Sequence, residues 1–226
     1  MREKAQQRFD AFTLVELLVV IVIIGWLAAL LLASLSGAKQ HSVRAKCLNN
    51  ERQVYLGMRI YADENNDTLP PREEPYWVAQ LQPYYVKAGV LMCPADVSRF
   101  GIDPDQVVTN SPNPTSYILN AFNYYAADGV TIIDDEGTPR VAGGVAVDLR
   151  PISSPSTAIL LAEKRDYSTS NNSFYMDYAG NDQGGKVHYR RHDGGSNYTF
   201  VDGHQEFILK DAVMTPHNLW TATAKD

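Results

Sequence analysis

The stretch that decides the fold runs AFTLVELLVVIVIIGWLAALLLASL, from Ala11 to Leu35. Its last nineteen residues, Leu17–Leu35, carry no charge. As a helix this run is about 28 Å long, close to the hydrocarbon thickness of a bilayer. A core helix of a globular domain usually has a polar face, whereas this run offers only Ser34 near its end. The sequence therefore predicts one membrane-spanning helix.

The charges on either side of the run predict its orientation. The first eleven residues carry a net charge of +1, from three basic and two acidic residues, and the whole chain carries −6, so the remainder carries −7. Basic residues before a span favour a cytoplasmic N-terminus, so we expect a single-pass inner-membrane protein with an extracytoplasmic head. The acidic remainder argues against nucleic-acid binding.

One carboxylate, that of Glu16, lies inside the apolar segment, where a charge is costly without a partner. A cut between Ala11 and Phe12 would create an α-ammonium group four residues before Glu16. In a filament, the ammonium of one subunit could neutralise Glu16 of its neighbour, so Glu16 is predicted to set the register of packed subunits. The alternative is a secretory signal peptide cleaved within ASLSGA, Ala33–Ala38, but here a charged leader precedes the apolar run and no good cleavage site follows.

The run from Ala11 to Gly25 resembles the prepilin cleavage and methylation motif of type IV pilins and type II secretion pseudopilins. The resemblance implies that a prepilin peptidase cuts before Phe12 and methylates its new amine. It also places Glu16 at the family's glutamate, the fifth mature residue. Ala11 stands where the family usually has glycine. Ala33 replaces a common proline, so this helix is expected to be straighter.

Further motifs resemble a pilin-like subgroup that has a histidine, nine residues and then Asp-Gly. His192 and Asp202-Gly203 fit that spacing, within RHDGGSNYTFVDGH that ends at His204. The other shared motifs are AKCLNN at Ala45–Asn50, YADENNDTLP at Tyr61–Pro70 and CPAD at Cys93–Asp96. This resemblance supports the placement of the chain more than any mechanism.

Beyond the span, the helical pattern continues and should end near Asn65-Asn66, before Pro70-Pro71. Its apolar stripe is formed by Val43, Cys47, Val54, Met58 and Tyr61, with Leu48, Tyr55 and Ala62 beside it. We expect this face to pack on a globular head. The predicted organisation is a leader at 1–11, a transmembrane and filament-core helix at 12–36, a helical spine at 37–66 and a head at 67–226.

The head is predicted to be small and mostly β. A short helix is expected at 76–86, an ambiguous apolar segment at 118–125, strands at 130–133, 141–147 and 157–162, and a surface loop at 168–185. Segments 197–201 and 204–208 flank Asp202-Gly203, a strong signal for a two-residue hairpin turn. A long helix followed by antiparallel strands predicts an α+β, pilin-like fold.

The two cysteines, Cys47 and Cys93, are predicted to lie in the extracytoplasmic head, where disulfides persist. We expect a disulfide between them, and the alternative is two buried thiols. They lack a C-x-x-C spacing and so give little support for zinc or redox chemistry.

The segment around His192 is expected to be structural. Asp202-Gly203 would supply positive φ angles to the turn, Phe200 would pack inward, and His192 would hydrogen-bond backbone to fix the hairpin beside His204. No nucleophile, phosphate-loop or zinc-protease motif accompanies these residues, so we expect neither an enzyme nor a required cofactor. Pseudopilins often hold calcium near the end of the head, and the resemblance makes Ca²⁺ a ligand to consider, with oxygens from Asp182, Asp193 or Asp202.

The sequence thus predicts a structural subunit that self-assembles into a pilus-like or pseudopilus filament. The resemblance implies a prepilin peptidase, an assembly ATPase and a platform membrane protein as partners. One alternative is a membrane-anchored periplasmic enzyme that depends on His192. Another is a minor tip subunit that binds a ligand through surface tyrosines, namely Tyr84, Tyr85, Tyr124, Tyr125 and Tyr178.

Overall fold

The computed structural model describes residues 13–71, 76–85, 87–101, 103, 115–120, 148–150, 152–165, 175–176, 187–213 and 219–220. The chain forms two compact units, Met1–His41 and Ser42–Asp226. One helix, α1 (Leu14–Glu64), supplies its first part to the first unit and its last part to the second. No proline interrupts α1, and leucine and alanine, which favour helices, are frequent in it.

The part of α1 in the second unit is amphipathic, as the stripe predicted. Cys47, Val54, Met58 and Ala62 are fully or almost fully buried, whereas the intervening polar residues other than Glu51 are exposed or half-buried. Glu51 lies on the same face and is also fully buried. After Glu64 the chain leaves the helix by turns at Asn66 and Asp67, which have φ angles of 56° and 58°. The predicted end near Asn65-Asn66 is therefore confirmed.

A five-stranded sheet forms the centre of the second unit, in the order β3-β1-β2-β4-β5. The neighbouring pairs β1–β2, β2–β4 and β4–β5 are antiparallel, and β3 adds a short parallel pairing at the edge beside β1. The strands are β1 (Tyr117–Asn120), β2 (Ile159–Glu163), β3 (Tyr175–Met176), β4 (Gly195–Phe200) and β5 (Gln205–Leu209). The long helix with this mainly antiparallel sheet confirms the predicted α+β fold.

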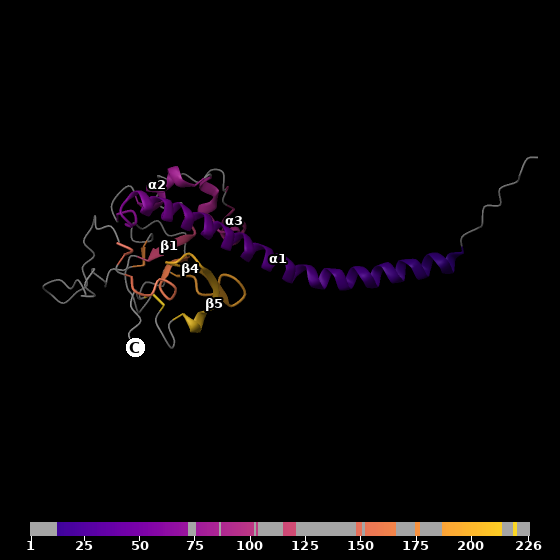
Figure 1. Cartoon of the computed structure of the whole chain (residues 1–226). Coiled ribbons are helices and arrows are strands. Elements are labelled where there is room, and N and C mark those ends of the chain that lie inside the picture. Colours follow the sequence, from indigo (N-terminus) through magenta and orange to yellow (C-terminus); the bar gives the residue numbers. More distant parts are fainter. Residues whose placement is uncertain are drawn as a thin grey trace, which may run out of the picture. The chain divides into compact units, whose positions relative to one another are not determined.

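The sheet is covered on both faces, so every residue of β1, β2 and β4 is buried. One face joins the core of α1, where Tyr117, Leu119 and Leu161 pack with Val54 and Met58. The other face carries a second core, formed by Ile118, Ile159, Ala162, Tyr198, Phe200, Ile208, Val213 and Trp220. Figure 1 shows α2 and α3 along one side of the head part of α1 and β4 and β5 along another.

The connection from α1 to the sheet is made of short helical pieces. These are α2 (Trp77–Gln80), η1 (Gln82–Tyr84), η2 (Ala88–Leu91) and α3 (Pro94–Phe100), and η5 (Lys210–Ala212) follows the last strand. The short helix predicted at 76–86 is found in part: α2 is α-helical, and a 3₁₀ turn that contains Pro83 follows it. Proline has no N–H to donate to a helical hydrogen bond and favours such a break.

Other predicted elements have mixed outcomes. The strand at 157–162 is confirmed as β2, and the apolar start of 118–125 belongs to β1. The predicted loop at 168–185 contains β3, which sequence reasoning missed because two residues give no periodicity. The predicted strands at 130–133 and 141–147 lie outside the described residues.

The β4–β5 hairpin is present, but its turn differs from the prediction. The Gly203 N–H donates to Phe200 O at 2.9 Å and the Phe200 N–H donates to His204 O at 3.0 Å, which leaves three residues in the loop. Gly203 has a φ of 88°, whereas Asp202 is not among the residues with positive φ. A three-residue loop that ends in a left-handed glycine is a common hairpin form. Phe200 is buried, as predicted.

Gly203 gives a stability prediction with an internal control. A Cβ atom at Gly203 would lie 2.4 Å from Cε1 of Tyr55, whereas one at Gly101, whose φ is also positive at 64°, would meet nothing within 4 Å. We expect Gly101→Ala to cost about 1–2 kcal/mol from backbone strain alone and Gly203→Ala to cost clearly more. Thermal unfolding of the full chain in detergent measures both variants, and equal losses would show that Tyr55 does not restrict this turn.

Candidate functional site

Glu16 lies in the first turn of α1 and is held by Thr13. Thr13 donates to Glu16 Oε2 through its hydroxyl at 2.7 Å and its backbone N–H at 2.9 Å, and the Glu16 N–H donates to Thr13 Oγ1 at 3.3 Å. This reciprocal pattern is a capping box, which satisfies N–H groups at a helix start. Sequence reasoning overlooked it, although T-x-x-E is visible at 13–16. Thr13 is neutral, so the charge of Glu16 is not compensated by this contact.

The apolar run that follows Glu16 is exposed along its described length. Trp26 is 78% exposed and Leu30 is 69% exposed. An 18-residue window of α1 has a mean hydropathy of 2.9, and none of it is buried in the protein. Within the described part of the chain, α1 is the one helix long and apolar enough to cross a membrane. An exposed apolar surface of this kind is expected to be covered by lipid or by other subunits.

A second group of candidate residues meets inside the head. Cys47 of α1, Cys93 before α3, Glu163 at the end of β2 and His192 before β4 bring their side-chain ligand atoms within 4.8 Å of one another. The carboxylate of Glu163 is the centre, because its Oε1 accepts from Cys47 Sγ at 2.8 Å and lies 2.7 Å from His192 Nε2. Cys93 Sγ lies 3.7 Å from the same nitrogen. All four side chains are buried.

Burial and hydrogen bonding shift the pKa values of this cluster in different directions. Burial raises the pKa of Cys47 well above its usual range, and its neighbours Cys93 and Glu163 raise it further. Burial also opposes ionisation of Cys93, but hydrogen bonds with Cys47 and His192 lower its pKa to about 6. Burial would lower the pKa of His192, but hydrogen bonds to Cys93 and Glu163 raise it to about 9. For Glu163, burial is outweighed by the contact with His192 and the charge of Arg191, so its pKa is lowered.

Further buried polar groups surround the cluster. Arg191 forms an ion pair with Asp96 and donates to the backbone oxygen of Lys164. The N–H of Asn197 donates to the second oxygen of Glu163, Oε2, at 3.1 Å. The hydroxyl of Tyr117 lies 3.5 Å from Cys47 Sγ. A buried ion pair such as Arg191–Asp96 costs desolvation, so these groups hold the cluster in place more than they stabilise the fold.

Glu51 adds a second buried carboxyl group next to the four residues. Thr199 Oγ1 donates to its Oε2 at 3.0 Å, while its Oε1 has no hydrogen-bond partner among the described atoms. Burial raises the pKa of Glu51 well above its usual range, and the nearby Glu163 raises it further. Burial thus favours the neutral form of the Glu51 carboxyl group.

Comparison with known families tests the N-terminal assignment. The model of the prokaryotic N-terminal methylation motif matches residues 7–32, the segment that contains Glu16 and the start of the exposed apolar run. The chain carries the pilin-type methylation motif. Comparison with curated proteins and with solved structures finds no match.

The pilin-type motif accounts for the first unit of the structure. The motif and the exposed apolar helix together fit a membrane-anchored pilin, which is a structural kind of protein. The motif also implies processing by prepilin peptidase and a place in a pilus or secretion assembly. Ala11 and Phe12, the residues at the expected cut, lie outside the described residues, so the cut itself stays a prediction.

The residues of the second motif, His-x9-Asp-Gly, lie at two sites: His192 in the buried cluster and Asp202-Gly203 in the β4–β5 turn. His192 faces the buried cluster, so its predicted role in fixing the hairpin is wrong. Its backbone instead closes the turn that leads into β4, with the His192 N–H donating to Gly195 O at 2.9 Å. Asp202 and His204 stay at the hairpin, where Oδ1 and Nδ1 lie 2.6 Å apart. The subgroup itself has no support beyond these residues.

The cysteine prediction needs revision, and the calcium prediction stays a prediction. The structure contains Cys47 and Cys93 as two buried free thiols, which was the alternative to the favoured disulfide. Asp193 and Asp202 are exposed and are not part of the ligand cluster, and Asp182 lies outside the described residues. Glu163 was missed, although a lone acidic residue at the end of the apolar run ILLAE is a usable signal.

Of the tyrosines suggested for ligand binding, the structure describes Tyr84 and Tyr85, and both contact other parts of the head. Tyr84 donates to Glu64 Oε2 at 2.6 Å and meets the ring of Tyr61 edge-on, with the ring centroids 5.8 Å apart. Tyr85 donates to the backbone oxygen of Val78. Tyr124, Tyr125 and Tyr178 lie outside the described residues.

Proposed function

We propose that this protein is a structural subunit of a type IV pilus-like or type II secretion pseudopilus filament. The observation that carries the proposal is the methylation motif, placed on an exposed apolar helix with one charged residue, Glu16, at its start. A membrane anchor alone needs no carboxylate at that depth, because the charge makes insertion less favourable. A helix that later packs against copies of itself can use that charge to select one register.

The N-terminal helix has two successive roles in this proposal. In the precursor it anchors the chain in the inner membrane, with Arg2, Lys4 and Arg8 on the cytoplasmic side. After a cut between Ala11 and Phe12 it leaves the bilayer for the filament core, where its apolar side chains contact other subunits. Prepilin peptidase, an assembly ATPase and a platform membrane protein are the partners that such a pathway requires.

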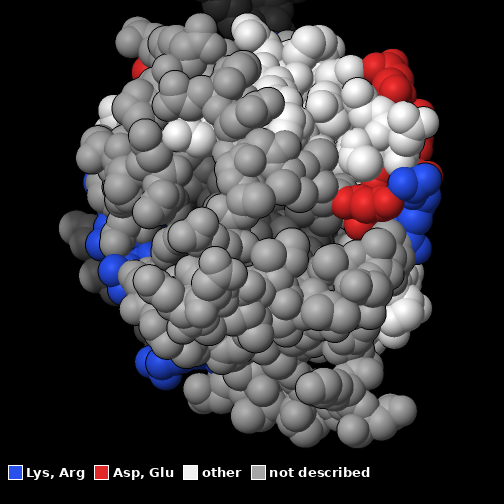
Figure 2. All heavy atoms as spheres, turned by 90° about the vertical axis from the view of Figure 1, so that its left-hand side faces the viewer, with Lys and Arg blue, Asp and Glu red and all other residues white. Residues whose placement is uncertain are grey.

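The head forms the outer surface of the filament. Its described surface carries both signs of charge, with Arg59 paired to Asp63 at 2.6 Å and to Asp67 at 2.8 Å, and Arg150 paired to Asp148 at 2.6 Å. Figure 2 shows acidic and basic side chains next to one another on one face of the head. Such a mixed surface suits an exposed solvent-facing role.

Fractionation tests this proposal in the native cell. We expect the chain to be present in filaments sheared from cells or purified with the secretion machinery, and an antibody to the head should label them. Deletion of the prepilin peptidase gene should leave the chain in the membrane fraction with its leader attached. A chain that stays in the membrane of peptidase-positive cells, with no filament-associated fraction, would contradict the filament role.

A further inference from the structure

The buried cluster of Cys47, Cys93, Glu163 and His192 has the composition of a metal site. We propose that these four residues bind one Zn²⁺ ion, which fastens the helix α1 to the sheet inside the head. The inference goes beyond the filament role and is independent of it. It rests on which ligand atoms meet, how they are buried and what surrounds them.

The four ligands come from separate parts of the chain. Cys47 is on α1, Cys93 precedes α3, Glu163 ends β2 and His192 precedes β4. Their ligand atoms nevertheless lie within 4.8 Å of one another in a buried space. Four protein ligands with no exposed position are the arrangement of a structural zinc site, whereas a catalytic site keeps one position open. The bound ion would therefore join four elements that are distant in sequence.

The distances between these atoms are close to those that zinc requires. Zinc lies about 2.0–2.3 Å from nitrogen, oxygen and sulfur ligands, so tetrahedral neighbours are about 3.3–3.8 Å apart. Cys93 Sγ and His192 Nε2 are already 3.7 Å apart. Glu163 Oε1 lies 2.8 Å from Cys47 Sγ and 2.7 Å from His192 Nε2, so these contacts must open by about 1 Å or less. Side-chain rotations can supply movements of that size.

A zinc ion would replace protons that the cluster now holds. Cys47 Sγ–H donates to Glu163 Oε1, and His192 Nε2 is at hydrogen-bond distance from the same oxygen. Zinc binds thiolates and the unprotonated nitrogen of an imidazole, so binding would release every proton that Cys47 Sγ, Cys93 Sγ and His192 Nε2 carry. Such proton release is general when zinc binds cysteine and histidine.

The donor set selects the kind of metal. Two sulfurs and one imidazole nitrogen favour a borderline-soft ion such as Zn²⁺ over Ca²⁺ and Mg²⁺, which prefer oxygen ligands. Glu163 fits this choice with one oxygen, since Oε2 accepts from the N–H of Asn197 and Oε1 is the atom that faces Cys47 and His192. Calcium, which the sequence had suggested for this head, does not fit this position.

Groups outside the four ligands hold them in place. The hydroxyl of Tyr117 lies 3.5 Å from Cys47 Sγ and 3.3 Å from Cys47 O, to which it donates. The buried guanidinium of Arg191, fixed by Asp96, adds positive charge near Glu163 and Cys93. Partners of this kind orient ligands and strengthen metal binding.

The main competing state of the cluster is a Cys47–Cys93 disulfide. A disulfide would join the two sulfurs. The carboxylate of Glu163 and the ring of His192 would then face an uncharged S–S bond. Zinc instead uses all four converging groups. The two states are exclusive, because a sulfur in a disulfide is not a thiolate ligand.

Metal analysis of the full chain tests the proposal. We expect the protein, purified in detergent from membranes without added metal or chelator, to contain one zinc ion per chain by elemental analysis. After removal of zinc with a chelator, Co²⁺ should restore a bound state that shows thiolate-to-cobalt charge transfer and strong visible bands of a tetrahedral site. Neither measurement depends on filament assembly, so the outcome is separate from that of the proposed function.

Matched variants locate the site. Glu163→Gln, His192→Gln and Cys93→Ser should lose stoichiometric zinc, whereas Glu51→Gln and His204→Gln should keep it. Glu51 is the sharper control, because it is an equally buried carboxyl group outside the ligand set. If a ligand variant fails to fold, the Co²⁺ spectrum of the wild-type chain still decides. A wild-type chain without zinc and without that spectrum, a Cys47–Cys93 disulfide in the purified protein, or equal zinc loss in Glu51→Gln would overturn the proposal.

Discussion

Glu16→Ala is expected to abolish filament assembly while membrane insertion of the precursor stays intact. Insertion depends on the apolar run, which has a mean hydropathy of 2.9 over 18 residues. A run this apolar inserts without the carboxylate of Glu16. Assembly depends on Glu16 because, in the proposed filament, it is the group that neutralises the α-ammonium of the neighbouring Phe12. Loss of one partner of a buried charge pair leaves the other uncompensated, which costs about 3–5 kcal/mol. Each subunit–subunit contact in the filament would carry that cost.

The capping box supplies the controls for this prediction. Glutamine can replace glutamate in a capping box, so Glu16→Gln keeps the contacts with Thr13 and removes only the charge. Thr13→Ala removes the cap, at about 1 kcal/mol, and keeps the charge. We expect Glu16→Gln to fail in assembly like Glu16→Ala, and Thr13→Ala to assemble. Sheared-filament yield and membrane content, measured by immunoblot with an antibody to the head, give both readouts.

The opposite pattern would assign Glu16 a different role. If Glu16→Gln assembles normally and Thr13→Ala does not, Glu16 serves only to start the helix. Loss of the precursor from the membrane in Glu16→Ala would show that the carboxylate acts in insertion rather than in packing.

The features that sequence predicted well are those set by local pattern. The end of α1 follows from the polar Asn65-Asn66 pair before two prolines, and the β4–β5 hairpin follows from Gly203 between two strands. Each depends on residues close together in the chain, where propensity and periodicity act. The helix predicted at 76–86 shows the limit, because only Trp77–Gln80 is α-helical and Pro83 lies in the 3₁₀ turn that follows.

The buried cluster could not be predicted in the same way. Its residues Cys47 and Glu163 are 116 positions apart, and only the pairing of α1 with the sheet brings them together. From the sequence, Cys47 was predicted to form a disulfide and His192 to fix a hairpin. These two separate roles gave no reason to expect contact between the two residues. Two acidic residues were the overlooked signal, Glu51 on the apolar face of α1 and Glu163 at the end of the apolar strand β2, since a buried carboxyl group requires partners.

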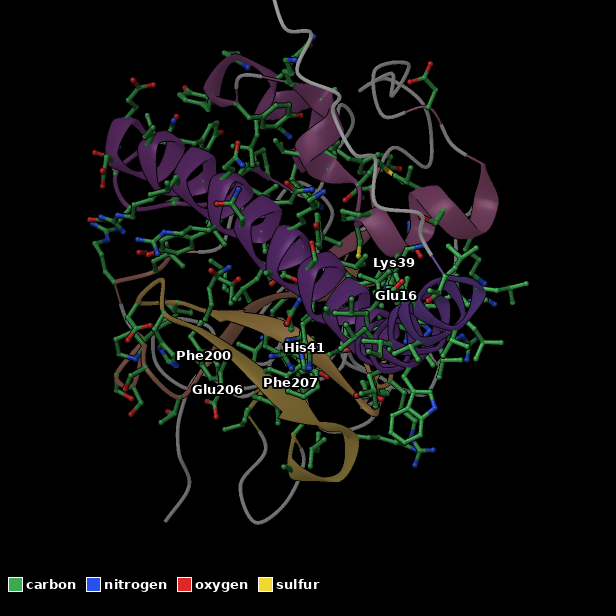
Figure 3. The ribbon with its side chains drawn as sticks, turned by 90° about the vertical axis from the view of Figure 1, so that its right-hand side faces the viewer. Glu16, Lys39, His41, Phe200, Glu206 and Phe207 are labelled. Atoms are coloured by element: carbon green, nitrogen blue, oxygen red, sulfur yellow. The ribbon has the colours of Figure 1, made fainter. Side chains whose placement is uncertain are left out.

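The interior of the head also shows why the second motif was misread. The histidine of His-x9-Asp-Gly and its Asp-Gly are on the same strand–turn–strand unit, which made one shared role the simplest reading. In the structure β4 separates them, with the ring of His192 at its start and Gly203 after its end. Figure 3 shows Phe200 on β4, and Glu206 and Phe207 on β5. The motif therefore combines a core contact with a turn.

Mass spectrometry of the mature N-terminus tests the central claim most directly. The claim is that the chain is a pilin-type precursor, cut by prepilin peptidase within the matched motif. Protein recovered from peptidase-positive cells should begin at Phe12 with a methylated amine, and protein from peptidase-deficient cells should keep the leader. The variant Ala11→Gly should give the same mature terminus, because it restores the residue that the family usually has before the cut. An intact Met1 in peptidase-positive cells, or a chain that begins after Ala38 as a secretory signal peptide would produce, would contradict the account.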